Sequence, residues 1–455
     1  MRRASWIAAL GSVLVLSALA SACSAGPTAP QTPAPSAPVA ATPSPGSAAS
    51  SAAPTPLGSL DRVAGWQADI DAIVPGLERL HPNPFHGTSK ADLEAASAAL
   101  AAQAPTLSDD QLMVGIARIA ALVSAKGCDA HTGLYVWGTG TFPVESLPLR
   151  LWLFGDDVVI VDALAPHQDL IGARIDAIEG HPIADVMALL DPVIPRDNDQ
   201  TVRLLAPRYL LIPQVLRGIG LENDSSVRFR YSKGDVSAEI DLASIPMADY
   251  NAWAGPYGLH LPLPPGHPDV RYLARVDDDL WWETLPDHET LYVQYNRVEP
   301  VDADVDLLRQ ALLEPGVTRI VLDIRNNFGG EVLPLDTIVG LFDDPAVDQP
   351  GKLFVITGRN TFSAASMLVA RLEARTDAIF IGEPMSGCPT TYGDNVELPL
   401  AHSGLSLLVS STFEIGVDPG DTRTTIPLDA VAELSQEEWA AGKDPALDLV
   451  LVSAP

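Results

Sequence analysis

The sequence predicts an α/β fold divided into several domains, and three observations carry this prediction. The chain has 455 residues, which is too long for a single hydrophobic core of ordinary size. Its first half changes from helical periodicity to short strand-like runs, and its second half alternates strands with helices. Hydrophobic residues make up 47% of the chain, which is enough to fill such cores.

The charge of the chain argues against one class of partner. Lys and Arg number 28 against 58 Asp and Glu, so the formal net charge is -30. Nucleic acids and anionic membranes are bound through basic surfaces. We therefore expect no nucleic-acid partner.

The N-terminal segment is predicted to export and tether the protein. Arg2 and Arg3 precede an apolar run over residues 6–20, which is typical of an export signal rather than a membrane-spanning helix. Residues 19–23, Leu-Ala-Ser-Ala-Cys, resemble a bacterial lipoprotein cleavage box, which implies that residues 1–23 are a lipoprotein signal peptide and that Cys23 is lipidated. Residues 24–57 are uncharged and rich in Pro, Ala and Ser, so we expect a disordered linker. These features predict an exported protein, lipid-anchored to the cell envelope.

Residues 58–140 are predicted to form a helical domain that carries His131. Apolar residues repeat at three and four between Trp66 and Leu80 and again between Leu112 and Val123, and Ser108 is followed three places later by Gln111, which predicts a helix cap.

Residues 145–250 are rich in short strands. The stretch 172–180 and a predicted helix over 183–190 resemble the core of a PDZ domain, with residues 192–222 as an insertion. An unrelated small β domain is the alternative, because the usual carboxylate-binding loop is missing. We interpret the Pro- and Trp-rich residues 251–289 as a connector.

Residues 290–455 alternate strands and helices, which predicts a mostly parallel or mixed sheet covered on both faces. Strands are expected at 291–295, 319–323, 352–356, 378–381 and 406–413, with helices at 303–313, 333–342 and 363–373. Ligands of such sheets bind at the carboxyl ends of the strands, so chemistry is expected after residues 323 and 356.

Three segments carry candidate catalytic groups. Residues 323–330, Asp-Ile-Arg-Asn-Asn-Phe-Gly-Gly, follow a strand, and paired glycines let the backbone turn sharply. Ser363 opens a helix whose first N-H groups are unpaired. His131 lies in the segment Asp-Ala-His-Thr after the helical domain. Each segment alone is more common in structural turns and helix caps than in active sites.

Together, these segments resemble the carboxyl-terminal processing, or tail-specific, serine proteases, whose catalytic core is crotonase-like and ClpP-like. The motifs are Asp-Xaa-Arg-Xaa-Asn-Xaa-Gly-Gly, Thr-Xaa-Ser-Xaa-Ala and the strand end Ile-Gly-Glu-Pro at 381–384. The resemblance implies Ser363 as nucleophile and an oxyanion hole formed by the N-H groups of Gly329 or Gly330 and of Ala364. We expect no metal and no organic cofactor, because the His residues are scattered without ligand spacing.

The resemblance also implies a base. One branch of the family uses a Lys after Gly-Glu-Pro, but Cys388 stands there in this chain. The branch of the tricorn core and the retinoid-binding-protein repeats carries Asp-Gly-His-Thr, which Asp-Ala-His-Thr matches with one change, so His131 is expected to be the general base. For the acid that orients His131, our first choice is Asp421, followed by Asp418 and Glu414.

If His131 and Ser363 meet, Cys128 and Cys388 come close as well. We therefore expect a disulfide between them that joins the helical and catalytic domains. A catalytic Cys388 is the alternative.

The function implied is a cell-envelope serine peptidase that cleaves exported proteins or peptides. Two alternatives remain: a non-catalytic lipoprotein that binds a hydrophobic ligand or peptide on the same fold, and an esterase or amidase of small substrates. The altered His131 motif and Met367, where many family members have Glu, motivate the binding alternative.

Overall fold

The computed structural model describes residues 61–453, apart from 139, 225, 256–258, 288 and 302–303. The predicted signal peptide, the linker and Cys23 lie outside the described residues. Residues 58–455 form one compact unit, so the domain boundaries expected within it stay predictions. The fold is α/β, as predicted. Within the described part of the chain, no helix is long and apolar enough to cross a membrane.

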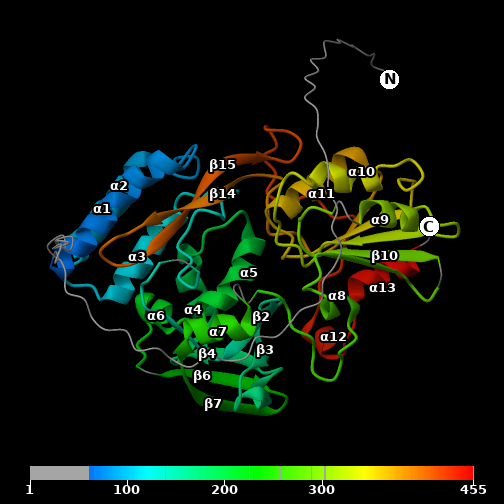
Figure 1. The fold of residues 1–455 in the computed structure, drawn as a ribbon. Coiled ribbons are helices and arrows are strands. Elements are labelled where there is room, and N and C mark those ends of the chain that lie inside the picture. The colour runs from blue at the N-terminus through cyan, green and yellow to red at the C-terminus, as the bar shows by residue number, and fades with distance from the viewer. Residues whose placement is uncertain are drawn as a thin grey trace, which may run out of the picture. The chain divides into compact units, whose positions relative to one another are not determined.

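The helical segment comprises α1 (Arg62–Leu80), α2 (Lys90–Gln103) and α3 (Asp109–Ala121), drawn in blue and cyan in Figure 1. Side chains of Asp61, Ser89 and Ser108 cap the three N-termini. Ser108 and Gln111 form the predicted reciprocal capping box. The chain then enters the turn that carries His131.

The β-rich segment is an antiparallel sheet in the order β2-β3-β4-β6-β7. Its elements are β2 (Leu149–Phe154), β3 (Asp157–Ala163), β4 (Arg174–Ile178), β5 (His181–Pro182), α4 (Ile183–Leu190), β6 (Ser226–Lys233) and β7 (Val236–Ala243). Smaller elements accompany it: β1 (Glu145–Ser146) pairs with β8 (Ile245–Pro246), and α7 (Met247–Ala254) and α8 (Arg271–Ala274) follow. The predicted helix 183–190 matches α4.

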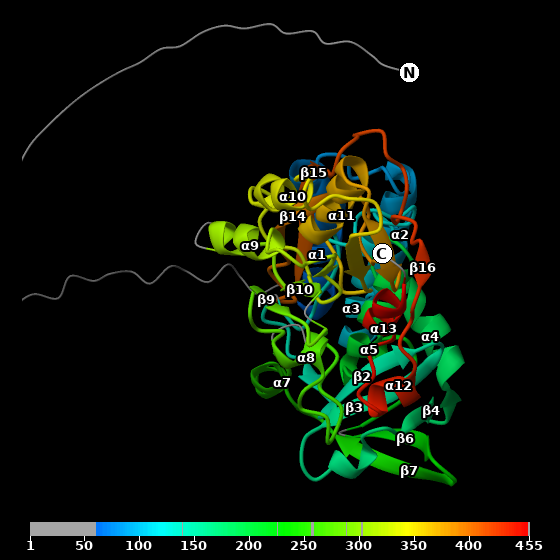
Figure 2. The ribbon, with the colours of Figure 1, turned by 90° about the vertical axis from the view of Figure 1, so that its right-hand side faces the viewer.

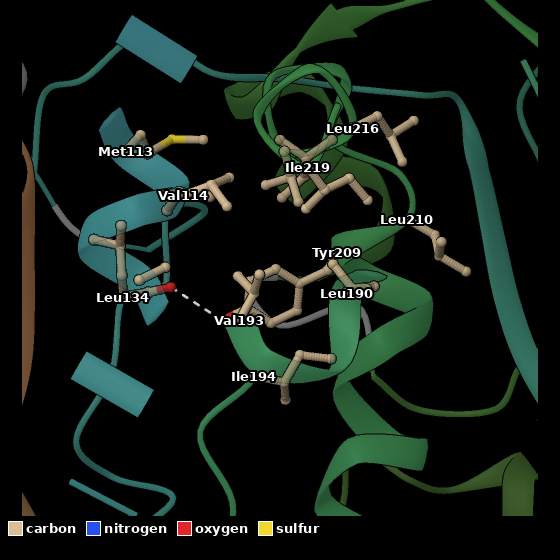
Figure 3. Close-up of a cluster of buried hydrophobic side chains, with 14 of the residues drawn as sticks. Met113, Val114, Leu134, Leu190, Val193, Ile194, Tyr209, Leu210, Leu216 and Ile219 are labelled. Carbon is tan, nitrogen blue, oxygen red and sulfur yellow. Dashed lines mark hydrogen bonds between the residues drawn. The ribbon is translucent and has the colours of Figure 1, made fainter. Parts of the chain in front are cut away.

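The insertion expected at 192–222 folds into α5 (Asp199–Tyr209) and α6 (Pro213–Gly218) and packs against α3. Figure 3 shows the shared cluster of buried side chains, in which the Tyr209 hydroxyl donates to the Leu134 carbonyl at 3.0 Å. A Cβ at Gly218 would lie 2.3 Å from Val114 Cγ2, so α6 and α3 approach closely because position 218 has no side chain. The insertion is therefore anchored on the helical segment.

The C-terminal sheet has the order β16-β13-β12-β11-β10-β9 and is parallel except for β9. Its strands are β9 (Leu280–Thr284), β10 (Thr290–Tyr295), β11 (Arg319–Asp323), β12 (Leu353–Thr357), β13 (Ile379–Gly382) and β16 (Ala430–Val431). Residues 251–289 are not only a connector, as we expected, because they contain β9, which forms the antiparallel edge strand of the C-terminal sheet.

Helices cover both faces of this sheet, as predicted. On one face lie α9 (Val305–Leu312), α10 (Leu335–Phe342) and α11 (Ala364–Arg375), and on the other lies α13 (Pro445–Val452), preceded by α12 (Gln436–Ala440). Figures 1 and 2 show α10 and α11 on one side and α13 on the other. Successive residues of a strand point to opposite faces of the sheet and so belong to different hydrophobic cores. Val293 packs in the core on the α11 side and Tyr292 in the core on the α13 side.

The late strand expected at 406–413 does not join this sheet. It forms β15 (Ser406–Ile415), which pairs with β14 (Thr390–Pro399) in a separate hairpin. The hairpin contacts the helical segment, because Leu398 packs against Gly76 of α1 and the main chains of Leu408 and Gly133 exchange hydrogen bonds. This hairpin joins the C-terminal part of the chain to the turn that carries His131.

Candidate active site

His131 and Ser363 meet, although 232 residues separate them in the sequence. The His131 Nε2 atom lies 3.1 Å from the Ser363 Oγ atom. Ser363 follows β12 at the N-terminus of α11, and the ring of Phe362 stacks on the His131 ring at 4.7 Å between centroids. The expected nucleophile and the expected base are thus within hydrogen-bond reach, the separation that proton transfer requires.

The backbone of Ser363 has φ 56° and ψ -129°, an unusual conformation for a residue with a side chain. Strained residues of this kind concentrate at functional sites, where their surroundings hold them. The segment that contains Gly387 packs closely against Ser363 and Ser366. A Cβ at Gly387 would lie 2.1 Å from Ser366 Oγ and 3.1 Å from Ser363 N. This packing therefore restrains the backbone of Ser363, whose hydroxyl lies beside His131.

The paired glycines lie against the serine. A Cβ at Gly329 would be 2.8 Å from Ser363 Cβ and 2.9 Å from Ala364 N, so only glycine fits there. The Gly329 N-H donates to Asn327 Oδ1 at 2.9 Å and is not free. Among the described residues, the N-H groups of Gly330 and Ala364 have no hydrogen-bond acceptor. Of the expected oxyanion donors, Gly330 and Ala364 are therefore available.

We predict that Gly329→Ala lowers the rate of acylation of Ser363 by about 100-fold or more, because the added methyl would displace the Ala364 N-H, an expected oxyanion donor. Its φ of 99° disfavours any side chain, and the added methyl would displace Ser363 or Ala364. Stopped-flow acylation by an activated ester measures this. Gly340→Ala, which meets no atom within 4 Å, is the control, and an equal loss in both variants would contradict the assignment.

His131 is suited to act as a base at neutral pH. Burial lowers the pKa of His131 below the ordinary value of 6.5, while the charges of Asp129, Glu414 and Asp394 and the backbone of Tyr392 oppose this shift. Its ring is therefore neutral near pH 7 and can accept a proton. The buried Nδ1 atom makes no hydrogen bond of regular geometry within the described part of the chain.

The structure does not support Asp421 as the orienting acid. Its carboxylate is paired with Arg423 at 2.7 Å, and this hydrogen bonding holds the pKa of Asp421 below its ordinary value. Asp418 accepts from the Gly420 N-H at 2.8 Å and is likewise turned to its own loop. Glu414 is the predicted carboxylate whose charge favours the protonated His131 ring.

Gly393 of β14 lies between Glu414 and His131. A Cβ placed at position 393 would be 3.2 Å from Glu414 Cγ, 3.8 Å from His131 Cε1 and 3.9 Å from His131 Nδ1. A side chain at 393 would therefore contact both Glu414 and His131, and the glycine leaves that space open. Glu414 is also held in place by the Thr412 hydroxyl. This arrangement was not evident from the sequence, because it depends on the register of the hairpin.

Asp129, which we did not predict as a site residue, fixes the turn that carries His131. Its buried carboxylate accepts hydrogen bonds from four groups: His81 Nε2 at 2.9 Å, His86 Nε2 at 3.1 Å, the Thr132 N-H at 3.2 Å and the Ser410 hydroxyl. Burial alone would raise the pKa of Asp129, but these hydrogen bonds hold it below its ordinary value. The only sequence signal was its place two residues before His131.

His81, His86 and Asp129 have one ligand atom each within 4.8 Å of one another, a spacing that a metal ion could use. The hydrogen bonds favour a different role. The Asn83 N-H donates to His81 Nδ1 at 2.9 Å, so the ring carries its proton on Nε2 and donates it to Asp129. A protonated Nε2 has no lone pair for a metal. The donor set fits a hydrogen-bonded carboxylate better than a metal centre.

Cys128 and Cys388 form the expected disulfide, with Cα atoms 5.4 Å apart. Cys128 lies three residues before His131, and Cys388 follows Gly387, which packs against Ser363. The bond therefore joins the two catalytic segments covalently. Because Cys388 is fully buried in this disulfide, it is not available as a catalytic thiol.

Comparison with known proteins supports the fold. No protein-family profile matches the chain, and no curated protein matches it in sequence. CPAF in complex with lactacystin is 11% identical, with 85% of this chain and 97% of CPAF covered at a TM-score of 0.56. A CPAF mutant is 12% identical, with 86% and 99% covered at 0.57. The tricorn protease matches 86% of this chain and 36% of its own at 14% identity, but its TM-score of 0.40 is too low to argue from. The chain therefore shares the fold of CPAF over most of its length.

Proposed function

We propose that the protein is a serine peptidase in which Ser363 is the nucleophile and His131 the general base. The observation that carries this proposal is the 3.1 Å contact between His131 Nε2 and Ser363 Oγ beside the unpaired N-H groups of Gly330 and Ala364. The motif resemblance and the fold shared with CPAF support it. A protein that only binds ligands would not require a base, a strained serine and free donors together.

The reaction would proceed through an acyl-enzyme. Ser363 Oγ attacks the carbonyl carbon of the scissile bond while its proton passes to His131 Nε2, and the carbonyl electron pair moves onto oxygen. The N-H groups of Gly330 and Ala364 would stabilise this oxyanion. Collapse breaks the C–N bond, and the leaving amine takes the proton from His131. Water then attacks the ester by the same route and releases the second product.

In this proposal Glu414 stabilises the imidazolium that forms when His131 takes the proton. The charge of Glu414 already favours the protonated ring, and Gly393 leaves the path between them open. Asp129 adds a second negative charge while holding the turn. Asp129 acts from the segment of His131, while Glu414 and Asp394 act from the hairpin β14–β15.

We further propose that the substrates are exported proteins or peptides and that Cys23 anchors the enzyme in the cell envelope by a lipid. The support is the N-terminal pattern of Arg2, the apolar run and the small residues before Cys23. The acidic net charge of -30 favours neutral or basic substrates. The expected PDZ-like segment would dock peptide termini by strand addition.

Fluorophosphonate labelling of the protein tests the proposal, with the labelled residue identified by mass spectrometry. We expect label on Ser363 and none in Ser363→Ala. Ser366→Ala is the matched control, because this buried serine in the same helix donates to the Thr361 carbonyl and lies outside the proposed chemistry. Folded protein without label would favour the non-catalytic binding function, and turnover of small esters without cleavage of peptides would indicate the esterase.

A further inference from the structure

Residues 196–201 of the insertion contact both catalytic segments. On the side of the base, Cys128 N and Asp129 N donate to the carbonyls of Asp197 and Arg196. On the side of the nucleophile, Thr201 Oγ1 donates to the Ser386 carbonyl at 2.8 Å and Asn198 Nδ2 to the Met385 carbonyl at 3.2 Å. The N-terminus of α5 therefore lies between the two segments that meet at the active site.

The side chain of Asp197 makes the most direct connection. One carboxylate oxygen accepts the Ala130 N-H at 2.6 Å, next to His131, and the other accepts the Cys388 N-H at 2.9 Å, next to Gly387. Asp197 is fully buried, and no cationic side chain pairs with it among the described residues. A buried carboxylate without a cation is costly, so its retention calls for a specific role.

We infer that Asp197 is a positioning residue that sets the separation of His131 and Ser363 by bridging the main chain of Ala130 and Cys388. This inference rests on the proposed function and adds to it a residue from the insertion, which otherwise belongs to the β-rich segment. The bridge acts beside the disulfide: the disulfide limits how far the two segments separate, and the two hydrogen bonds fix their orientation. A shift of about 1 Å at such a site can cost about 100-fold in rate.

The ionisation of Asp197 provides a readout. Burial raises the pKa of Asp197 to about 7, with the nearby charge of Asp129 in the same direction, against the hydrogen bonds from Ala130, Cys388 and Thr391. The neighbouring Arg196 side chain is paired with Asp191 instead. Above pH 7 the Asp197 carboxylate is ionised, and both of its oxygens can accept an N-H hydrogen bond. Below pH 7 one oxygen carries a proton that points at an N-H donor and repels it. The bridge should therefore weaken as the pH falls through about 7.

The experiment measures the rate at which a fluorophosphonate phosphonylates Ser363, with loss of fluoride, from about pH 5 to about pH 9 in the full chain, in Asp197→Asn and in Asp69→Asn. In the unmodified protein we expect two rises in rate, one below 6.5 from His131 and one near 7 from Asp197. In Asp197→Asn an NH2 group replaces one of the two accepting oxygens and cannot accept the N-H that faces it. This variant should lack the rise in rate near pH 7 and should react about 10- to 100-fold more slowly. Asp69→Asn is the control, because Asp69 is a buried acceptor of the His402 and Ser403 N-H groups outside the site.

A second measurement does not depend on catalysis or on the variant folding. In ¹⁵N-histidine spectra of the unmodified protein, the His131 ring should show its own titration below 6.5 and a further inflection near 7. An upper rise in rate that persists in Asp197→Asn, or a His131 ring without the second inflection, overturns the inference. Absence of label with the inflection present would reject the peptidase and retain the positioning role.

Discussion

Replacement of His131 with alanine is expected to lower the acylation rate of Ser363 by about 10⁴- to 10⁶-fold near pH 8, the scale seen when a serine hydrolase loses its base. The serine hydroxyl is a weak nucleophile unless a base takes its proton, and His131 Nε2 is the acceptor within reach at 3.1 Å. Fluorophosphonate labelling followed over hours, with melting curves to show that the variant folds, measures the loss.

His402→Ala is the control for this substitution. His402 lies on the exposed turn between β14 and β15, and its hydrogen bond to Asp69 is made by the main-chain N-H, so labelling should be unchanged. A loss below about tenfold in His131→Ala would mean that another group takes the Ser363 proton, because removal of a true base costs orders of magnitude more.

Removal of the disulfide between Cys128 and Cys388 is expected to lower the free energy of unfolding by about 5 kcal/mol in the chain-entropy treatment. The bond closes a loop of 260 residues, and the entropy of the unfolded chain rises with the length of the loop that is freed. Denaturant unfolding of the Cys128→Ser, Cys388→Ser double variant gives the value. Engineered bonds often deliver less than this treatment, so a loss of about 2 kcal/mol would still agree.

The same double variant should also be a slower catalyst at temperatures where it remains folded. The bond joins the segment of His131 to the segment packed beneath Ser363, so its loss removes a restraint on their approach. A variant with unchanged midpoint and unchanged acylation would show that Asp197 and the hairpin hold the site without help.

Much of the fold follows from local patterns in the sequence. Helices α1 and α3 have regular apolar repeats and capping side chains, and the strands of the C-terminal sheet are short apolar runs between helices. Strand β9 was missed because its residues, Leu-Trp-Trp-Glu-Thr, stand among prolines and aspartates, and only its pairing with β10 makes it a strand. Pairing between distant segments is not encoded in local periodicity.

In the candidate site too, residues in short motifs could be predicted from the sequence, and residues placed by contacts between distant segments could not. Ser363, His131 and the glycine pair could be named because each stands in a short motif, and the cysteines followed once the first two were expected to meet. Glu414 ranked below Asp421 because the choice depends on the register of the hairpin, which pairs Thr412 with Gly393 and brings Glu414 close to Gly393. Asp197 carried no sequence signal, since its role arises from two main-chain N-H groups in other segments.

The hairpin β14–β15 has a consequence for the order in which the protein becomes active during synthesis. The turn of His131 is completed early in the chain, yet it is held by Ser410, Leu408 and the Tyr392 main chain. The ribosome adds these residues more than 250 positions after His131, so a partly synthesised chain lacks the contacts that bring His131 and Ser363 together. The candidate site therefore forms only after residues 392–410 have been synthesised, long after the turn of His131.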